Sequence, residues 1–287
     1  MIDNKKINYN SSAALKTFLK EEGLGMRKKF GQNFLINPVT RLALVNALDC
    51  GAEDEVWEIG PGLGAMTTLL LEKGLYVRAF EIDTGFIRVL KEIFAGEKNF
   101  SLVEGDVMKT WGNQKPAQFL LGNLPYNVAA ALLADFIEKG QLFTRIAVTV
   151  QKEVALRMTA SAGSPEYSSF SVLCASAYTV KPLMVIRPSS FYPQPNVDSM
   201  GVFLEKKPSP AQQIPPVFFP LVRALFASRR KTIKNNLTVF LSSIFGNLQS
   251  VITPLLRENG LTGNERAENL YFESFLSLAK YIENMRK

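Results

Sequence analysis

Residues 55–64 of this chain have the sequence EVWEIGPGLG. The first five residues form a short, mainly apolar run that is typical of a buried strand. Glycines follow at alternate positions, and residues 65–73 have the pattern of a helix that ends before Gly74. Glycine lets the backbone approach a ligand that any Cβ would exclude. A strand, a glycine turn and a helix in this order therefore predict the nucleotide-binding unit of an open α/β sheet.

The glycine spacing differs from that of dinucleotide-binding enzymes. The segment has Glu58 and then Gly60, Gly62 and Gly64 at alternate positions, instead of the pattern G-x-G-x-x-G. Glu58 allows two interpretations. An acidic residue here suits a positively charged cofactor, and S-adenosylmethionine is one. Alternatively, Glu58 orders the glycine turn through backbone N–H groups.

Polar side chains stand where the next predicted strands end. Residues 76–83 form a second strand, with Glu81 at its end, where a carboxylate can hold two ribose hydroxyls. Residues 100–106 form a third strand ending at Asp106, which could accept a hydrogen bond from an adenine amino group or only cap a helix. Residues 117–122 form a fourth strand that leads to Asn123. Because parallel strands share their carboxyl edge, we expect these side chains to lie together.

Residues 122–126, GNLPY, follow that fourth strand. Asn123 offers a carbonyl that can accept from an amino group, and Tyr126 offers a flat face. Pro125 has no N–H and forces the residue before it into an extended conformation, so nearby carbonyls can turn toward a ligand. The segment could hold a planar molecule with an exocyclic amine. A simple turn of the chain is the alternative.

The other predicted elements have ordinary lengths. They are helices over 10–22, 38–48, 128–139 and 168–177, a strand over 146–150, and a closing antiparallel pair over 180–186 and 200–204. Between the last two strands, a loop with three prolines holds Phe191 and Tyr192 near the carboxyl edge of the sheet. Either ring could stack on a base opposite Tyr126. Alternatively, the aromatic ring packs beneath its own loop.

Composition limits the chemistry. The chain has 287 residues, 47% of them hydrophobic, which supports a large domain plus a small one. It has no His, so the usual general base and the commonest metal ligand are missing, and we expect no metal. Its two cysteines, Cys50 and Cys174, do not form a disulfide framework. With no long apolar run and no signal peptide, we expect a soluble cytoplasmic protein that does not bind a membrane.

Positive charge is concentrated at the two ends. Residues 1–34 carry a net +4 and residues 208–287 a net +5, whereas the total is +7. This distribution suggests that a polyanion is bound by the ends and a small ligand by the centre, although an ordinary solvated surface is the alternative. Residues 217–241 are predicted to be helical and include five cations and no acidic residue, which is typical of a phosphate-binding surface. These are Arg223, Arg229, Arg230, Lys231 and Lys234.

The motifs in this order resemble those of the ribosomal RNA adenine dimethyltransferase family, most closely its bacterial small-subunit branch. They are KKFGQNFL at 28–35, EIGPGLG at 58–64, NLPY at 123–126, FYPQPNVDS at 191–199 and RRKT at 229–232. The resemblance covers about residues 25–287. Residues 1–24 are therefore an N-terminal extension to which it assigns no role. It implies a methyltransferase catalytic domain over 25–207 and a helical RNA-binding domain over 208–287.

The resemblance also implies a Rossmann-like α/β sheet that binds S-adenosylmethionine, with S-adenosylhomocysteine as product, followed by a small all-α domain. The cofactor-binding residues would be Asn33, Leu35, Gly60, Gly62, Glu81, Ile82, Asp106, Val107 and Asn123. The catalytic residues would be Asn123, Leu124, Pro125, Tyr126 and Phe191. Lys28 and Lys29 would bind RNA together with the five cations of 217–241.

The implied substrate is a pair of adjacent adenosines in the 3′-terminal hairpin of small-subunit (16S) rRNA, within an immature subunit. Each would be methylated twice at N6 by a monomeric enzyme. One alternative is the large-subunit branch associated with antibiotic resistance, although the RRKT tract and the helical tail favour the small-subunit branch. Another is a ribosome assembly factor in which methylation is secondary or lost.

Overall fold

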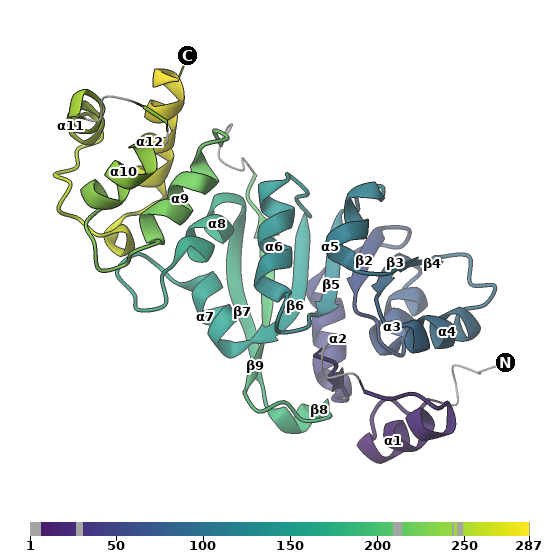
Figure 1. Ribbon diagram of the computed structural model, residues 1–287. Coiled ribbons are helices and arrows are strands. Elements are labelled where there is room, and N and C mark those ends of the chain that lie inside the picture. The colour runs from purple at the N-terminus through teal and green to yellow at the C-terminus, as the bar shows by residue number, and fades with distance from the viewer. Residues whose placement is uncertain (1–6, 27–30, 209–213, 243, 246–248, 287) are drawn as a thin grey trace. The chain divides into compact units, whose positions relative to one another are not determined.

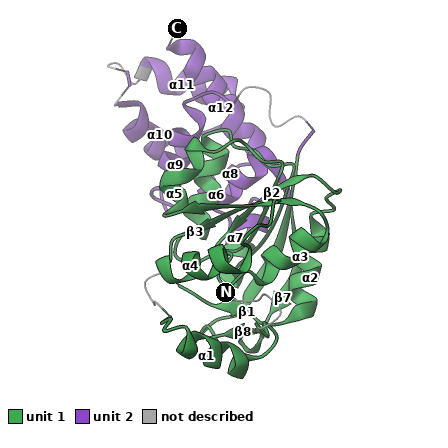
Figure 2. Ribbon diagram, turned by 90° about the vertical axis from the view of Figure 1, so that its right-hand side faces the viewer, with its two compact units in different colours: residues 1–155, 180–206 green, residues 156–179, 207–287 purple. Residues whose placement is uncertain are grey.

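A computed structural model describes residues 7–26, 31–208, 214–242, 244–245 and 249–286. The chain forms two compact units, coloured separately in Figure 2. The first contains the described residues up to Ala155 together with Val180–Lys206, and the second contains Leu156–Thr179 and the rest of the chain from Lys207. The chain therefore crosses between the units at 155/156, 179/180 and 206/207, and the predicted boundary at 207/208 lies one residue from the last of these. The N-terminal extension is part of the first unit.

A seven-stranded sheet is the centre of the first unit, with strand order β4-β3-β2-β5-β6-β9-β7 (Figure 1). The strands are β2 (Glu55–Ile59), β3 (Tyr76–Glu81), β4 (Phe100–Glu104), β5 (Phe119–Asn123), β6 (Arg145–Gln151), β7 (Tyr178–Ile186) and β9 (Ser199–Lys206). Strands β4, β3, β2, β5 and β6 are parallel, and β9 is antiparallel to β6. The predicted open α/β sheet is confirmed.

Helices bury both faces of this sheet. They are α2 (Pro38–Ala47), α3 (Ala65–Glu72), α4 (Thr84–Ile93), α5 (Val107–Thr110), followed by the 3-10 turn η3 (Trp111–Asn113), and α6 (Ala129–Glu138). Side chains alternate along a strand, so Val56 packs with Leu44 of α2 and Leu70 of α3, while Trp57 faces the other way. The Trp57 ring lies 6.2 Å from that of Phe136 on α6. The central strand β5 is buried along most of its length and is accordingly almost wholly apolar, whereas the edge strands β4 and β7 are largely unburied.

Two further short strands form a second sheet, which packs against the glycine turn that follows β2. Strand β1 (Phe34–Leu35) is antiparallel to β8 (Phe191–Tyr192), with Leu35 opposite Phe191; the 3-10 turn η4 (Pro188–Ser190) precedes β8. Helix α1 (Ser12–Glu21) lies near this pair in both ribbon views (Figures 1 and 2). Its buried residues Leu15 and Leu19 share an apolar cluster with Phe34 and Tyr192. The helix of the extension is thus anchored by burial of its apolar face.

The second unit is helical and has its own apolar core. Its elements are α7 (Lys152–Thr159, which begins in the first unit), α8 (Ser169–Ala177), α9 (Phe218–Phe226), α10 (Ile233–Ser242), α11 (Gln249–Glu258), η5 (Ala267–Asn269) and α12 (Phe272–Met285). Tyr167 and Val172, from the segment before β7, are buried in this core with Leu221 of α9 and Phe275 of α12. This packing explains why residues 156–179 group with the C-terminal helices.

Residues 217–241 are largely helical, as predicted, but the helix is interrupted. The structure has two helices, α9 and α10, and a turn between them at residues 227–232. The Nδ2 of Asn236 donates to the Leu225 carbonyl at 2.8 Å and to the Ser228 carbonyl at 3.3 Å, which holds the end of α9 against α10. The basic residues 229–231 therefore lie in a turn.

Among the described residues, no helix is both long enough and apolar enough to cross a lipid bilayer. Nor does the described part of the chain bring three His, Cys, Asp or Glu side chains together in a way that could hold a metal ion.

Candidate active site

A cavity of about 300 Å³ lies at the carboxyl ends of β2, β3 and β5. Every residue that the sequence predicted to bind the cofactor lines it: Asn33, Leu35, Gly60, Gly62, Glu81, Ile82, Asp106, Val107 and Asn123. These residues come from segments far apart in the sequence, and the parallel sheet brings them together at one edge. The predicted cofactor-binding residues, which include the predicted catalytic residue Asn123, therefore surround a single cavity.

The glycine turn after β2 requires glycine for reasons of space and conformation. Gly60 and Gly62 both have positive φ, 68° and 60°. A Cβ on Gly62 would lie only 2.9 Å from the ring of Phe34 on β1. The turn can therefore pack closely against β1 while its backbone lines the cavity.

Glu81 connects this turn to the end of β3. Its side chain is only 5% exposed and accepts hydrogen bonds from the backbone N–H groups of Gly62 at 3.1 Å, and of Ile82 and Asp83 at 2.9 Å each. Burial raises the pKa of Glu81 to about 7, and the three amide hydrogen bonds oppose that rise. A carboxylate has about four acceptor positions, so Glu81 keeps capacity for a hydroxyl group of a ligand.

Glu58 does not line the cavity. It is fully buried, and the hydroxyl of Thr67 on α3 donates to its Oε2 at 2.6 Å. Its Oε1 has no hydrogen-bond partner among the described residues. Burial raises the pKa of Glu58 to about 7. Of the two interpretations of Glu58, the structure favours an ordering role, which acts on the helix after the glycine turn rather than on a ligand.

Asp106 serves as a helix cap and also faces the cavity. Its Oδ1 accepts from the Met108 backbone N–H at 3.0 Å at the start of α5. The residue is only partly buried and lines the cavity together with Val107. The two interpretations of Asp106 are therefore compatible, since capping uses one of its two oxygens.

The side chain of Asn123 is held from two sides. Its Nδ2 donates to the Asn33 carbonyl at 2.5 Å, and its Oδ1 accepts from the hydroxyl of Thr149, a buried residue of β6. The Thr149 carbonyl also accepts from the Leu124 N–H at 3.2 Å. Thr149 thus contacts two consecutive residues of the segment at 122–126 and fixes the orientation of the Asn123 amide.

The side chain of Tyr126, the last residue of the segment at 122–126, is held by a hydrogen bond to β9. Its hydroxyl makes a 2.5 Å hydrogen bond with that of Ser199, a fully buried residue at the start of β9. Burial raises the pKa of Tyr126. The sequence analysis missed both Ser199 and Thr149. A polar residue at an otherwise apolar strand position was the available signal for each.

Phe191 does not occupy the position expected for a stacking residue. It is 1% exposed and packs in an apolar cluster with Leu35 and Leu44. The pairing of β1 with β8 causes this, because it sets Phe191 directly opposite Leu35 and leaves Tyr192 on the other face. The alternative interpretation, an aromatic ring packed beneath its own loop, describes Phe191 in this structure.

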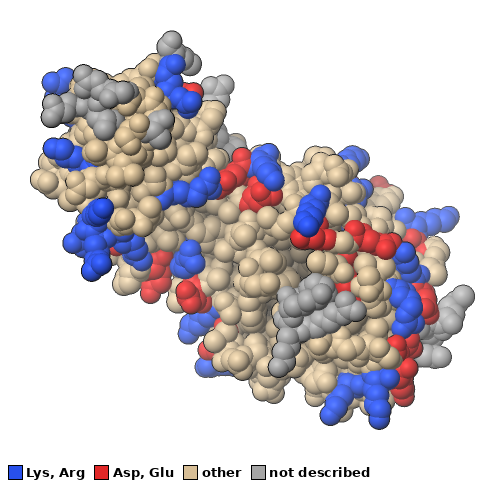
Figure 3. Space-filling view, viewed as in Figure 1, with Lys and Arg blue, Asp and Glu red and all other residues tan. Residues whose placement is uncertain are grey.

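The predicted RNA-binding residues divide into three groups. Lys28 and Lys29 lie outside the described residues. Arg223, Arg230, Lys231 and Lys234 are exposed on the helical unit. Figure 3 shows Lys and Arg side chains gathered on the surface of that unit, with few acidic side chains among them.

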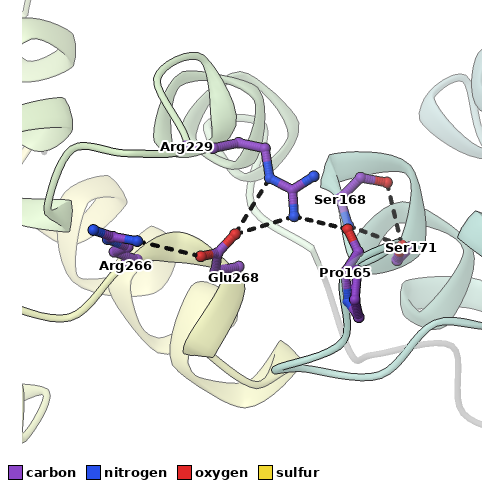
Figure 4. Close-up of polar contacts among 6 residues, drawn as sticks. All are labelled: Pro165, Ser168, Ser171, Arg229, Arg266 and Glu268. Carbon is purple, nitrogen blue, oxygen red and sulfur yellow. Dashed lines mark hydrogen bonds and ion pairs between the residues drawn. The ribbon is translucent and has the colours of Figure 1, made fainter.

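Arg229, the third group, holds parts of the helical unit together. Its Nη2 lies 3.0 Å from Glu268 Oε2 on η5 and also donates to the Pro165 carbonyl at 3.0 Å (Figure 4). Arg266 lies 3.8 Å from the other oxygen of Glu268. Arg229 therefore joins the turn after α9 to η5 and to the loop before α8, so much of its charge is already neutralised.

Residues of the N-terminal extension also line the cavity, which the sequence analysis did not predict. Tyr9 and Leu15 face it, and the Tyr9 hydroxyl donates to the Leu63 carbonyl in the glycine turn at 2.9 Å. Arg41 of α2 is a further lining residue. The only available signal was the apolar face of the predicted helix at 10–22, which had to pack against something.

A mainly parallel sheet with a glycine turn, and with the carboxylates of Glu81 and Asp106 around one cavity, fits the class of S-adenosylmethionine-dependent methyltransferases. Comparison with known proteins narrows the class. The chain belongs to the ribosomal RNA adenine dimethylase family, whose model matches residues 23–284.

Similar proteins cover almost the whole chain. Ribosomal RNA small subunit methyltransferase A of Treponema denticola is 47% identical over 97% of this chain and 97% of its own length. The protein of that name from Treponema pallidum is 42% identical over 95% of this chain and 96% of its own. The crystal structure of a dimethyladenosine transferase from Plasmodium falciparum matches with a TM-score of 0.76 and 26% identity, over 86% of this chain and 96% of that one.

Proposed function

We propose that the protein transfers methyl groups from S-adenosylmethionine to N6 of two adjacent adenosines in the 3′-terminal hairpin of 16S rRNA, giving N6,N6-dimethyladenosine. It acts as a cytoplasmic monomer on an immature small subunit. The observation that carries this proposal is that Asn123 lines the same cavity as Glu81 and Asp106. The names of the most similar relatives support the small-subunit substrate over the large-subunit alternative.

The residues of the cavity fit the cofactor. The Asp106 carboxylate would accept from the adenine amino group, and Glu81 would accept from a ribose hydroxyl with the acceptor position that its three amide contacts leave unused. The positive-φ glycines give the backbone close access to the ligand. When bound, S-adenosylmethionine supplies a methyl group on a positively charged sulfur.

Asn123 and Leu124 orient the nucleophile. The N6 of adenine is a poor nucleophile because its lone pair is delocalised into the ring. The carbonyls of the Asn123 side chain and the Leu124 backbone would accept from the N6 hydrogens, which favours a pyramidal nitrogen with its lone pair directed at the methyl group. Thr149 uses one lone pair of Asn123 Oδ1 and leaves the second for this bond.

Alignment replaces acid–base catalysis in this proposal. Holding two reactants in line can contribute roughly 7–11 kcal/mol. The surplus proton of the cationic product leaves to water, which suits a chain with no His. No side chain of the site has to transfer a proton.

Tyr126 provides the stacking surface for the target base. Extruding a base from its stack costs a few kcal/mol, and stacking on one aromatic ring contributes roughly 1–3 kcal/mol. The hydrogen bond to Ser199 fixes the ring before the base arrives, so little entropy is lost on stacking. Because Phe191 is buried, we assign the stacking to Tyr126.

The exposed cations of the helical unit would hold the RNA backbone. Arg223, Arg229, Arg230, Lys231 and Lys234 are all exposed, and Arg229 also forms an ion pair with Glu268. Phosphate contacts of this kind position an RNA without reading its sequence. Specificity for the hairpin would come from the site in the first unit.

Incubating the protein with labelled S-adenosylmethionine and unmethylated immature small subunits tests the proposal. The label should appear as N6,N6-dimethyladenosine at two adjacent positions of 16S rRNA, and Asn123→Ala should remove it. Label on large subunits instead would support the large-subunit alternative. If Glu81→Ala restored subunit maturation in a deletion strain without any methylation, the assembly-factor alternative would gain support.

A further inference from the structure

Arg41 is a buried cation of the cavity that forms no ion pair with any described residue. It is 5% exposed and lies on α2. Its Nη1 donates to the carbonyls of Leu35 at 2.6 Å and Tyr9 at 3.3 Å, and its Nη2 donates to Asn10 Oδ1. These acceptors are all neutral, and its Nε has no hydrogen-bond partner among the described residues. Burial lowers the pKa of Arg41, as expected for a desolvated cation.

Burying the Arg41 guanidinium in this way costs free energy unless a ligand supplies the missing hydrogen-bond partner. Taking a guanidinium out of water costs several kcal/mol, and neutral carbonyls return only part of that. Arg41 also lines the cavity. A buried polar atom without a partner, on a side chain facing a ligand cavity, indicates that the missing partner belongs to the ligand.

The charges around the cavity indicate which part of the cofactor this is. Among the described residues lining it, Glu81 and Asp106 are acidic and Arg41 is the one cation. S-adenosylmethionine has cationic groups and a single anionic group, the carboxylate of its amino-acid part. Arginine matches a carboxylate better than any other side chain, because it offers several N–H donors in a fixed plane.

We infer that Arg41 binds the carboxylate of the cofactor's amino-acid part, and that the N-terminal extension holds Arg41 in position for it. Tyr9 and Asn10 of the extension supply two of the acceptors that fix the guanidinium. The Tyr9 hydroxyl in turn holds the extension to the glycine turn. Tyr9, Asn10 and Leu15 thus give the extension, to which the sequence analysis assigned no role, a part in the cofactor site. The inference rests on the proposed use of S-adenosylmethionine and is independent of the RNA substrate.

The test compares two ligands without RNA, S-adenosylhomocysteine and its analogue in which hydrogen replaces the carboxylate. Binding is measured by isothermal titration calorimetry on the full chain. Wild-type protein should bind the analogue about 10–100-fold more weakly, which is the range for hydrogen bonds to charged groups. The variant Arg41→Met should bind both ligands with nearly equal affinity, because the group that distinguishes them is gone.

Arg88→Met is the matched control. Arg88 is an exposed residue of α4. It lies 3.1 Å from Glu22 Oε2 and also donates to the Glu22 carbonyl at 3.0 Å, so it contacts the extension at a point outside the cavity. This variant should keep the wild-type preference for the carboxylate. If Arg41→Met weakened both ligands equally and left their ratio unchanged, Arg41 would be only structural and the inference would be overturned.

The wild-type comparison keeps the inference testable if Arg41→Met fails to fold. Equal wild-type affinity for the two ligands would overturn it without any variant. If wild-type protein bound neither ligand, the proposed use of S-adenosylmethionine would fail instead, which separates the two claims.

Discussion

The protonation of Glu81 should control the affinity for the adenosine part of the cofactor. Glu81 is almost fully buried, and burial raises its pKa from an ordinary 4.5 to about 7. Only the ionised carboxylate can accept from a ribose hydroxyl while it also accepts from the amides of Gly62, Ile82 and Asp83. Affinity should therefore rise with pH through about 7.

The size of the effect follows from the ionised fraction. With a pKa of about 7, roughly a tenth of Glu81 is ionised at pH 6 and roughly nine-tenths at pH 8. The dissociation constant should therefore fall about tenfold between these values, which corresponds to about 1.4 kcal/mol. It should change little above pH 8.

The assay uses 5′-methylthioadenosine, which has the adenine and ribose but neither the ammonium nor the carboxylate of the cofactor. Calorimetry at constant ionic strength over pH 5.5–8.5 gives the dissociation constants. Glu81→Gln should bind weakly at every pH. Glu58→Gln, a buried neighbour outside the cavity, should keep the rise in affinity. A flat profile in wild-type protein, or one abolished by Glu58→Gln and kept by Glu81→Gln, would refute the reasoning.

Four further outcomes can be measured. Because burial raises the pKa of Glu58 from 4.5 to about 7, its contribution to the free energy of unfolding is full below pH 4.5 and falls by about 3 kcal/mol as the pH rises to 7; urea denaturation of Glu58→Gln should show a smaller fall. Thr149→Val, which frees the Asn123 amide, should lower kcat roughly tenfold and leave the affinity for S-adenosylhomocysteine unchanged. Arg229→Ala should destabilise the helical unit by about 1 kcal/mol in thermal denaturation, whereas Arg230→Ala should not. The double variant Arg230→Ala, Lys231→Ala should weaken rRNA binding and reduce the slope of log affinity against log salt by roughly 1.4–1.8.

The parts of the site that follow strand ends could be predicted from the sequence. Glycine turns and single polar residues after apolar runs are local signals, and the geometry of a parallel sheet brings their positions together. This reasoning predicts that Gly60, Glu81, Asp106 and Asn123 lie together at the carboxyl edge of the sheet. In the structure they line one cavity.

Other parts depend on contacts between distant segments, which local patterns do not contain. Tyr9 is 54 residues from its partner Leu63, and Arg41 has the sequence environment of an ordinary helical cation. Thr149 acquires its role only because β6 lies beside β5. Phe191 was misplaced for the same reason, since its burial depends on the pairing of β8 with β1. The break between α9 and α10 depends on the hydrogen bonds of Asn236.

The threading of the polypeptide through its two units limits how the protein can be divided. The chain passes between them near residues 155, 179 and 206, so the helical unit is not a simple tail. A fragment that ended at Lys206 would retain α8 but lose the helices that bury Tyr167 and Val172. It would therefore expose an apolar surface that favours aggregation. Exchanging this unit between relatives would need three matched junctions, so the two units are expected to be inherited together.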